Sequence, residues 1–105
     1  MTMKKKTMTS GLKPMHPGEL LREDVIPAVK VTRTEIARLL GISRQTLHGI
    51  LNEKQPVTPD VAVRIGKLFG NGPRLWLNLQ QRFDVEKAEK KLGKQIDKIP
   101  TLKVA

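Results

Sequence analysis

Residues 33–52 read RTEIARLLGISRQTLHGILN and contain two short helical patterns joined by a tight turn. A helix-turn-helix needs a small residue where its second helix packs against the first, and Ala37 occupies that place. It also needs a residue that tolerates a positive φ at the turn, which Gly41 provides. The apolar positions of a shared core follow at the required spacing: Ile36, Leu40, Ile42, Leu47 and Ile50. A plain helical hairpin has a similar periodicity, but the combined pattern favours a helix-turn-helix.

Both helices begin with a capping residue. Thr32 precedes the first helix, and Glu35 is expected to reach back to it as the second half of a capping box. Ser43 caps the second helix after a turn of only two residues. We expect Leu39 to share the buried face of the first helix with its apolar neighbours. The caps strengthen the prediction because they fix where each helix begins.

Three further helices are predicted on either side of this motif. The first spans residues 16–27, with His16 as its cap and Pro27 ending it at or just before its own position. The second spans residues 58–69 and opens with the cap Thr58 and a proline at its first helical position. The third spans residues 73–92, where an apolar stripe runs until Gly93. Residues 52–57 form a loop and no strand is indicated, so the fold is predicted to be all-α with five helices.

The length and composition exclude several classes of protein. A chain of 105 residues supports one domain. The sequence has no cysteine, which excludes disulfides, thiolate zinc sites and cysteine nucleophiles. A reducing, cytoplasmic setting is expected. No apolar run is long enough to span a membrane, and neither a cofactor nor a metal site is predicted.

The positive charge is concentrated at the two ends of the chain. Lys and Arg number 20 against 10 Asp and Glu, which gives a net charge of +10. Residues 1–15 carry four lysines and no acid, whereas the bases and acids of residues 16–60 cancel. Basic ends of this kind either bind phosphates or only keep a small protein in solution. We divide the chain into a disordered basic arm at 1–15, a helix-turn-helix domain at 16–92 and a flexible tail at 93–105.

The motif predicts which side chains would meet double-stranded DNA. The second helix of a helix-turn-helix lies in the major groove, and its first residues face the bases. Its outward positions are Arg44, Gln45, Thr46, His48 and Gly49. Arginine pairs with guanine and glutamine with adenine, and Gly49 would let the backbone approach the groove closely. The residues predicted to contact phosphates, at or beside helix N-termini, are Thr32, Arg33, Thr34 and Ser43. The alternative for Arg44 is an ordinary solvated arginine.

Three stretches together point to one family. They are His16-Pro17-Gly18-Glu19-Leu20-Leu21, the helix-turn-helix at residues 34–51, and Trp76-Leu77-Asn78-Leu79-Gln80. Over about residues 15–87 the chain resembles the HigA-type antitoxins, also called virulence-associated protein I, of the lambda-repressor-like class. The helix-turn-helix alone indicates only the lambda-repressor-like class, and the two flanking motifs narrow the resemblance to the HigA-type antitoxins. The resemblance implies a five-helix, lambda-repressor-like fold.

The resemblance also implies partners. Members of this family are homodimers that repress their own operon at a DNA operator and neutralise a HigB-like toxin, a ribosome-dependent mRNA endonuclease. Their dimers form largely through the fifth helix, so Trp76, Leu79 and Phe83 would be shared between core and dimer interface. Core packing alone is the alternative for each of them. The family often has a glycine where this chain has Lys30, so a different or strained turn is expected there.

A surface for the toxin is predicted from charge. Ribonucleases of this kind are usually basic, because they must hold RNA phosphates, and their inhibitors present acids. The acidic cluster of the first predicted helix is Glu19, Glu23 and Asp24. We assign the toxin-facing surface to it, because the basic ends of the chain would repel such a toxin and suit DNA better.

Other functions fit less well. An enzyme would have to use His16 or His48, which lie far apart in sequence and are assigned to a cap and to the DNA-facing surface. A binder of RNA or single strands would stack bases on aromatic residues, but the three aromatics here lie on apolar stripes. The basic fifth helix resembles a membrane-surface helix only weakly. The closest alternative is a solitary helix-turn-helix repressor without a toxin.

Overall fold

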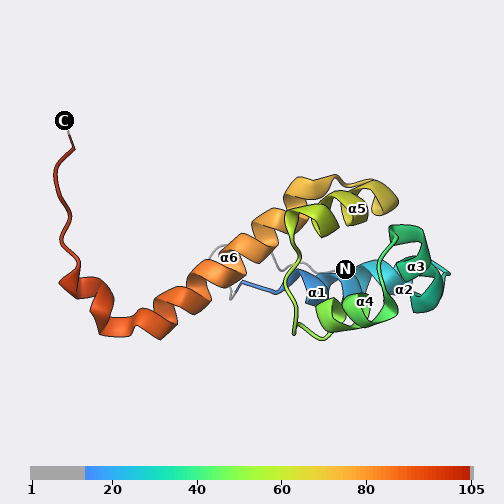
Figure 1. Cartoon of the computed structure of the whole chain (residues 1–105), viewed down its shortest axis with the longest axis horizontal. Coiled ribbons are helices and arrows are strands. Elements are labelled where there is room, and N and C mark those ends of the chain that lie inside the picture. Colours follow the sequence, from blue (N-terminus) through green and yellow to red (C-terminus); the bar gives the residue numbers. More distant parts are fainter. Residues whose placement is uncertain (1–13, 105) are drawn as a thin grey trace.

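The computed structural model describes residues 14–104, and all regular structure in that range is helical. The chain starts with one continuous helical segment made of α1 (Pro17–Leu20), the π-helical turn η2 (Leu21–Val25) and α2 (Ile26–Ala28). It continues with α3 (Arg33–Leu40), α4 (Arg44–Leu51), α5 (Pro59–Phe69) and α6 (Pro73–Leu92), as Figure 1 shows. The 3-10 helix η3 (Gly93–Lys98) and an extended segment follow. With the first three pieces taken as one helix, the prediction of five helices and an all-α fold is confirmed.

The first helical segment ends later than predicted. It reaches Ala28, so Pro27 lies inside its last turn instead of stopping it. A proline in a helix cannot make the hydrogen bond to the carbonyl four residues back, and its ring crowds that carbonyl. The π-helical turn immediately before Pro27 uses a wider bonding pattern and relieves this conflict. The predicted arm at 1–15 lies outside the described residues except for its last two.

One hydrophobic core joins the body of the molecule. It contains the predicted apolar positions of α4 and those of α3 except Leu39, together with residues of α1–η2, α5 and the first half of α6. The residues with no exposed surface at all are Ile50, Leu51, Ala62, Ile65 and Trp76. Val57, in the loop after α4, is also buried and was not predicted to be. Leu39 is 49 % exposed, so its predicted place on the buried face is wrong: α4 and α5 cover only the neighbouring stripe of α3.

Two glycines let helices approach more closely than any side chain allows. A Cβ on Gly18 would lie 1.8 Å from the carbonyl oxygen of Ile50, so α1 packs directly on the backbone of α4. A Cβ on Gly66 would lie 2.4 Å from the carbonyl oxygen of Gly72, where the chain turns from α5 into α6. The glycine of the sequence stretch at residues 16–21 therefore has a packing role: it sets where α4 lies.

The second half of α6 leaves the body. Figure 1 shows it running outward to η3 and the C-terminus, a stretch that we call the C-terminal arm (residues 85–104). The radius of gyration is 16.5 Å, well above the roughly 13 Å of a compact chain of about 100 residues. Large apolar side chains are exposed along this arm: Val85, Leu92, Ile96, Ile99, Leu102 and Val104. These apolar side chains alternate with exposed lysines, and nothing in the described part of the chain covers them.

Candidate nucleic-acid interface

The N-termini of α3 and α4 are both capped and exposed. The Thr32 hydroxyl accepts a hydrogen bond from the Glu35 backbone N–H at 3.1 Å, and the Ser43 hydroxyl accepts one from the Thr46 N–H at 2.9 Å. Both caps are as predicted. The second half of the capping box is wrong, because the Glu35 carboxylate accepts from Arg38 Nε at 2.9 Å instead of turning back to Thr32. The Arg38 guanidinium also holds the pKa of Glu35 below its ordinary value.

The turn between the two helices follows the prediction. Gly41 has φ 75° and ends α3 in the left-handed conformation, where a glycine costs no strain. Ile42 is half-buried and packs against the core. The turn directs α4 so that its inner face is buried through Leu47, Ile50 and Leu51 while its opposite face remains open.

The open face of α4 carries three of the predicted base-reading side chains. Arg44, Gln45 and His48 are exposed, and the first two lie in the first turn of the helix. Thr46 is half-buried, and its hydroxyl oxygen accepts a hydrogen bond from the Ser43 hydroxyl at 2.9 Å. The structure therefore leaves Arg44, Gln45 and His48 free of the cap, whereas Thr46 and Ser43 are engaged in it.

Gly49 has a different surrounding from the one expected. A Cβ there would lie 2.7 Å from the side-chain Cδ of Gln55, and the Gly49 carbonyl accepts from the backbone N–H groups of Lys54 and Gln55. The missing side chain makes room for the loop after α4. Its predicted role in a close approach to DNA has no support in this geometry.

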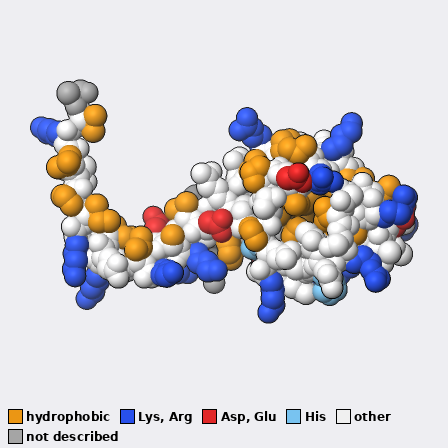
Figure 2. Space-filling view, viewed as in Figure 1, with side chains coloured by type: hydrophobic (Ala, Val, Ile, Leu, Met, Phe, Trp, Pro, Cys, Tyr) orange, Lys and Arg blue, Asp and Glu red, His pale blue; other side chains and the backbone are white. Residues whose placement is uncertain are grey.

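The predicted phosphate contacts lie on the exposed edge beside α4. Thr32, Arg33 and Thr34 are all exposed at the beginning of α3, whose free N–H groups face solvent there. Figure 2 shows Lys and Arg side chains around the rim of the body and along the C-terminal arm. The polar face of α4 and the first residues of α3 are therefore both accessible, as a helix-turn-helix that contacts DNA would require.

Two arginines that the sequence did not single out hold the other ends of these helices. Arg64 Nη1 donates to the Leu40 carbonyl at the end of α3 at 2.8 Å, and Arg22 Nη1 donates to the Leu51 carbonyl at the end of α4 at 2.6 Å. The last carbonyls of a helix have no partner within it, so each arginine satisfies one. These contacts join residues 24 and 29 positions apart, and no local pattern predicts them.

His16 contacts α1, α6 and the loop after α4. Its Nδ1 accepts from the Gly18 N–H at 2.9 Å, which confirms it as the cap of α1. Its ring meets that of Phe83 edge-on at 5.0 Å between centroids. Burial lowers the pKa of His16, while the charge of Glu53 and a hydrogen bond with the Gln55 backbone act in the opposite direction. Nearby, the Gln80 side-chain carbonyl accepts from the Val57 N–H at 2.8 Å, so α6 also supports the loop after α4.

The residues predicted for a dimer interface are mostly internal. Trp76 and Leu79 are 0 % and 3 % exposed in the single chain, and the Trp76 indole N–H donates to Asn71. Only Phe83 retains exposed surface, beside His16. As folded, neither Trp76 nor Leu79 offers surface to a second copy, whereas the C-terminal arm does.

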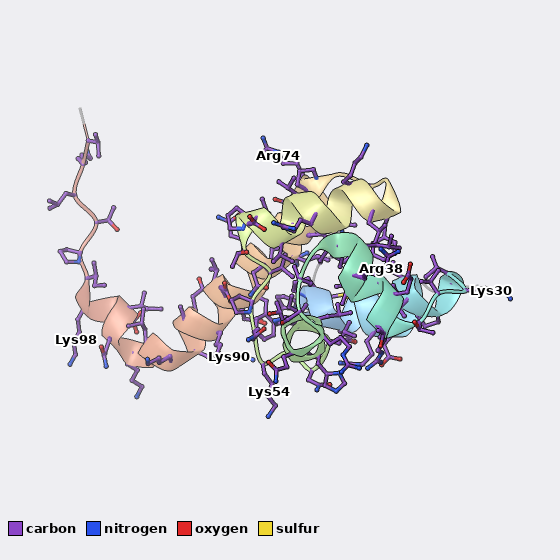
Figure 3. The ribbon with its side chains drawn as sticks, turned by 45° about the vertical axis from the view of Figure 1, so that its right-hand side comes forward. Lys30, Arg38, Lys54, Arg74, Lys90 and Lys98 are labelled. Carbon is purple, nitrogen blue, oxygen red and sulfur yellow. The ribbon has the colours of Figure 1, made fainter. Side chains whose placement is uncertain are left out.

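The acidic residues of the first helical segment lie on its outer side. Glu23 and Asp24 are exposed and Glu19 is half-buried, while Glu23 accepts from Arg22 Nε at 2.8 Å. Lys30 projects from the far end of the body (Figure 3). The strain expected at Lys30 is absent, because Glu53 is the one non-glycine residue with a positive φ in residues 14–104.

The described part of the chain has neither a metal-binding cluster nor a membrane span. No group of three or more His, Asp or Glu residues there is arranged to hold a metal ion. No described helix is long and apolar enough to cross a membrane.

The chain is similar to known proteins over most of its length. A family model described as Helix-turn-helix matches residues 21–77. Virulence-associated protein I of Dichelobacter nodosus is 33 % identical over 75 residues, which are 71 % of this chain and 69 % of that protein. Among solved structures, PA4674 of Pseudomonas aeruginosa, in complex with its operator DNA, has a TM-score of 0.80 and 33 % identity, over 90 % of this chain and 100 % of that one. A HigA-family addiction module antidote protein of Coxiella burnetii has a TM-score of 0.78 and 39 % identity, over 88 % of this chain and 100 % of that one.

The fold and the open face of α4 define a DNA-binding protein of the helix-turn-helix class. The chain belongs to the helix-turn-helix family and, within it, to the HigA-type antitoxins and virulence-associated proteins. It is therefore an antitoxin-like DNA-binding protein and not an enzyme.

Proposed function

We propose that this protein is a cytoplasmic, homodimeric antitoxin that represses its own operon by binding a palindromic operator through α4. The observation that carries the proposal is the open face of α4, where Arg44, Gln45 and His48 are exposed beside the exposed N-terminus of α3. Support comes from the similar protein PA4674, whose structure holds its operator DNA. Repression would follow from occupation of promoter DNA.

A two-fold operator requires two copies, and the C-terminal arm supports their association. Val85 and Leu92 are exposed seven residues apart, which places them on the same side of α6, and the exposed Ile96 and Ile99 follow in and just after η3. An exposed apolar stripe of this kind is typical of a helix that pairs with another helix. We infer that the dimer forms through the arm, with Phe83 at its inner edge. The two recognition helices would then read half-sites roughly 34 Å apart.

The finer proposal is that the protein neutralises a HigB-like toxin. The acidic side chains of α1 and η2, Glu19, Glu23 and Asp24, offer a basic toxin a surface on the outer side of the first helical segment. A triple charge reversal at these positions should abolish binding of the toxin encoded beside the gene and spare DNA binding. Intact toxin binding would remove this surface from the proposal, and no toxin gene beside it would favour the solitary repressor.

Operator binding is tested by fluorescence anisotropy at two salt concentrations. The probes are the DNA upstream of the protein's own gene and a scrambled duplex of the same length. The proposal predicts selective binding that persists at the higher salt, because base contacts do not depend on counterion release as phosphate contacts do. Equal binding to both probes, lost at the higher salt, would mean that the charge of +10 acts alone.

A further inference from the structure

The turn that ends α4 is built around a residue in an unfavourable conformation. The Glu53 N–H donates to the Ile50 carbonyl at 3.0 Å and the Lys54 N–H to the Gly49 carbonyl at 2.8 Å. This pair of bonds is the Schellman arrangement, which requires a left-handed residue and usually takes glycine. Here that residue is Glu53, with φ 61°.

Other helices of the body end differently. Gly41 and Gly70 are the left-handed residues after α3 and α5, with φ 75° and 79°. Glycine adopts this conformation without penalty, whereas the Cβ of a glutamate crowds the following carbonyl. Since the same chain uses glycine at the two comparable turns, the glutamate after α4 needs a reason that outweighs its strain.

The reason is visible in what the Glu53 side chain contacts. Its carboxylate accepts from Arg22 Nη1 at 3.2 Å, and the same nitrogen donates to the Leu51 carbonyl at 2.6 Å. Arg22 comes from η2, in the helical segment that packs on α4, and its side chain is 30 % exposed. Glu53 therefore keeps the Arg22 guanidinium aimed at the last turn of α4. Figure 3 shows the next residue, Lys54, pointing away from the body, so the turn directs the two side chains apart.

The Arg22 contact lies at the end of a short helix. α4 has eight residues and is about 12 Å long, so a shift of one end tilts the whole helix. Ser43 fixes its first turn, and the contact of Gly18 with the Ile50 carbonyl supports its last turn from below. The Arg22 bond to Leu51 is the polar contact that holds the same end from the side. The angle at which Arg44 and Gln45 meet the groove depends on it.

We propose that Glu53 and Arg22 are positioning residues for DNA recognition: Glu53 accepts a strained turn in order to hold Arg22 on the C-terminal end of α4. The inference rests on the proposed function, in which α4 reads the operator. Neither side chain needs to touch a base, and their effect is on the ratio of operator binding to binding of scrambled DNA.

The test separates stability from recognition. Glu53→Gly removes the strain together with the carboxylate, so the variant should melt at the same temperature as the unaltered protein or higher. Its preference for operator over scrambled DNA should nevertheless fall by about tenfold, the factor expected for one lost charge-assisted hydrogen bond. Arg22→Met should lower the same ratio, and the double variant should be no worse than Arg22→Met alone. Each ratio is measured at a temperature at which every variant is folded.

Two controls account for charge and for the shared arginine. Glu53→Gln loses the charge but keeps an oxygen that can accept from Arg22, so it should retain most of the preference. Glu23→Gln removes the other acidic partner of Arg22 without changing the turn, and it should leave the ratio unchanged. If Glu53→Gly discriminates as well as the unaltered protein, the proposal is overturned whatever its melting temperature. If the unaltered protein itself does not discriminate, the proposed function fails instead.

Discussion

The contact between Gly18 and α4 makes a quantitative prediction for Gly18→Ala. The added Cβ would lie 1.8 Å from the Ile50 carbonyl oxygen, and real Cβ atoms essentially never come closer than 3.0 Å to such an atom. The two backbones must therefore separate by about 1.2 Å. Neither partner is a flexible side chain, so the strain spreads into the packing of Leu21, Ile50 and Leu51. We expect a loss of at least about 3 kcal/mol in the free energy of unfolding.

Thermal unfolding followed by circular dichroism measures this loss. For a domain of this size, 3 kcal/mol corresponds to a fall in Tm of at least about 12 °C. Gly49→Ala is the matched control, because it makes the same change on α4 but meets only the side chain of Gln55, which can move away. Its Tm should change little, since alanine in a helix offsets a small packing cost. If Gly18→Ala and Gly49→Ala melt together, the close approach of α1 to α4 does not support the fold as described.

Three further predictions follow from named contacts. Burial lowers the pKa of His16 below its ordinary 6.5, so the unfolded chain takes up a proton that the folded chain resists. The stability is therefore full above about pH 6.5 and falls as the pH drops from there toward the folded-state pKa. Melting curves across this range should show the fall, His16→Gln should flatten it, and His48→Gln should leave it in place. Arg64→Met should cost about 1–2 kcal/mol in chemical unfolding, because the Leu40 carbonyl loses its donor, and an unchanged midpoint would argue against that cap. Leu92→Lys combined with Ile96→Lys should convert the proposed dimer to monomer in analytical ultracentrifugation at unchanged Tm, since both side chains are exposed in the single chain, and a persisting dimer would place the interface elsewhere.

Local patterns made most of the fold predictable. Thr32, Ser43 and Thr58 cap the helices that the sequence assigned to them, and Gly41 has the positive φ that its turn requires. Each of these depends on residues within a few positions of one another, where hydrogen-bonding geometry is nearly independent of the rest of the chain. The same holds for the buried stripe of α4.

The errors and omissions come from contacts between distant segments. Leu39 has the apolar character of a core residue, but which side of α3 is covered depends on where α5 packs. The side chain of Gln55 occupies the space that a side chain at position 49 would need, and Arg22, 29 residues away, donates to the Leu51 carbonyl. Trp76 suited a core or an interface equally well, and only the packed chain places it inside. A sequence pattern identifies the side chains available, and the fold decides what they contact.

The candidate base-reading site could be predicted only in outline. The helix-turn-helix pattern identified α4 and its outward positions, because helical periodicity fixes which side chains share a face. It did not show that the Thr46 hydroxyl bonds with Ser43, which depends on the rotamers of the cap. Arg44, Gln45 and His48 remain the exposed members of the predicted set.

The central claim is that α4 reads the operator through Arg44 and Gln45. It is tested most directly by titrating Arg44→Ala and Gln45→Ala against the operator and a scrambled duplex. Arg74→Ala, which removes another exposed arginine, from the first turn of α6, is the control for charge. Each α4 variant should lose about 1–3 kcal/mol of binding free energy on the operator and little on scrambled DNA, while Arg74→Ala should weaken both slightly and equally. Equal losses on both duplexes for Arg44→Ala and Gln45→Ala would contradict the assignment of these side chains to bases.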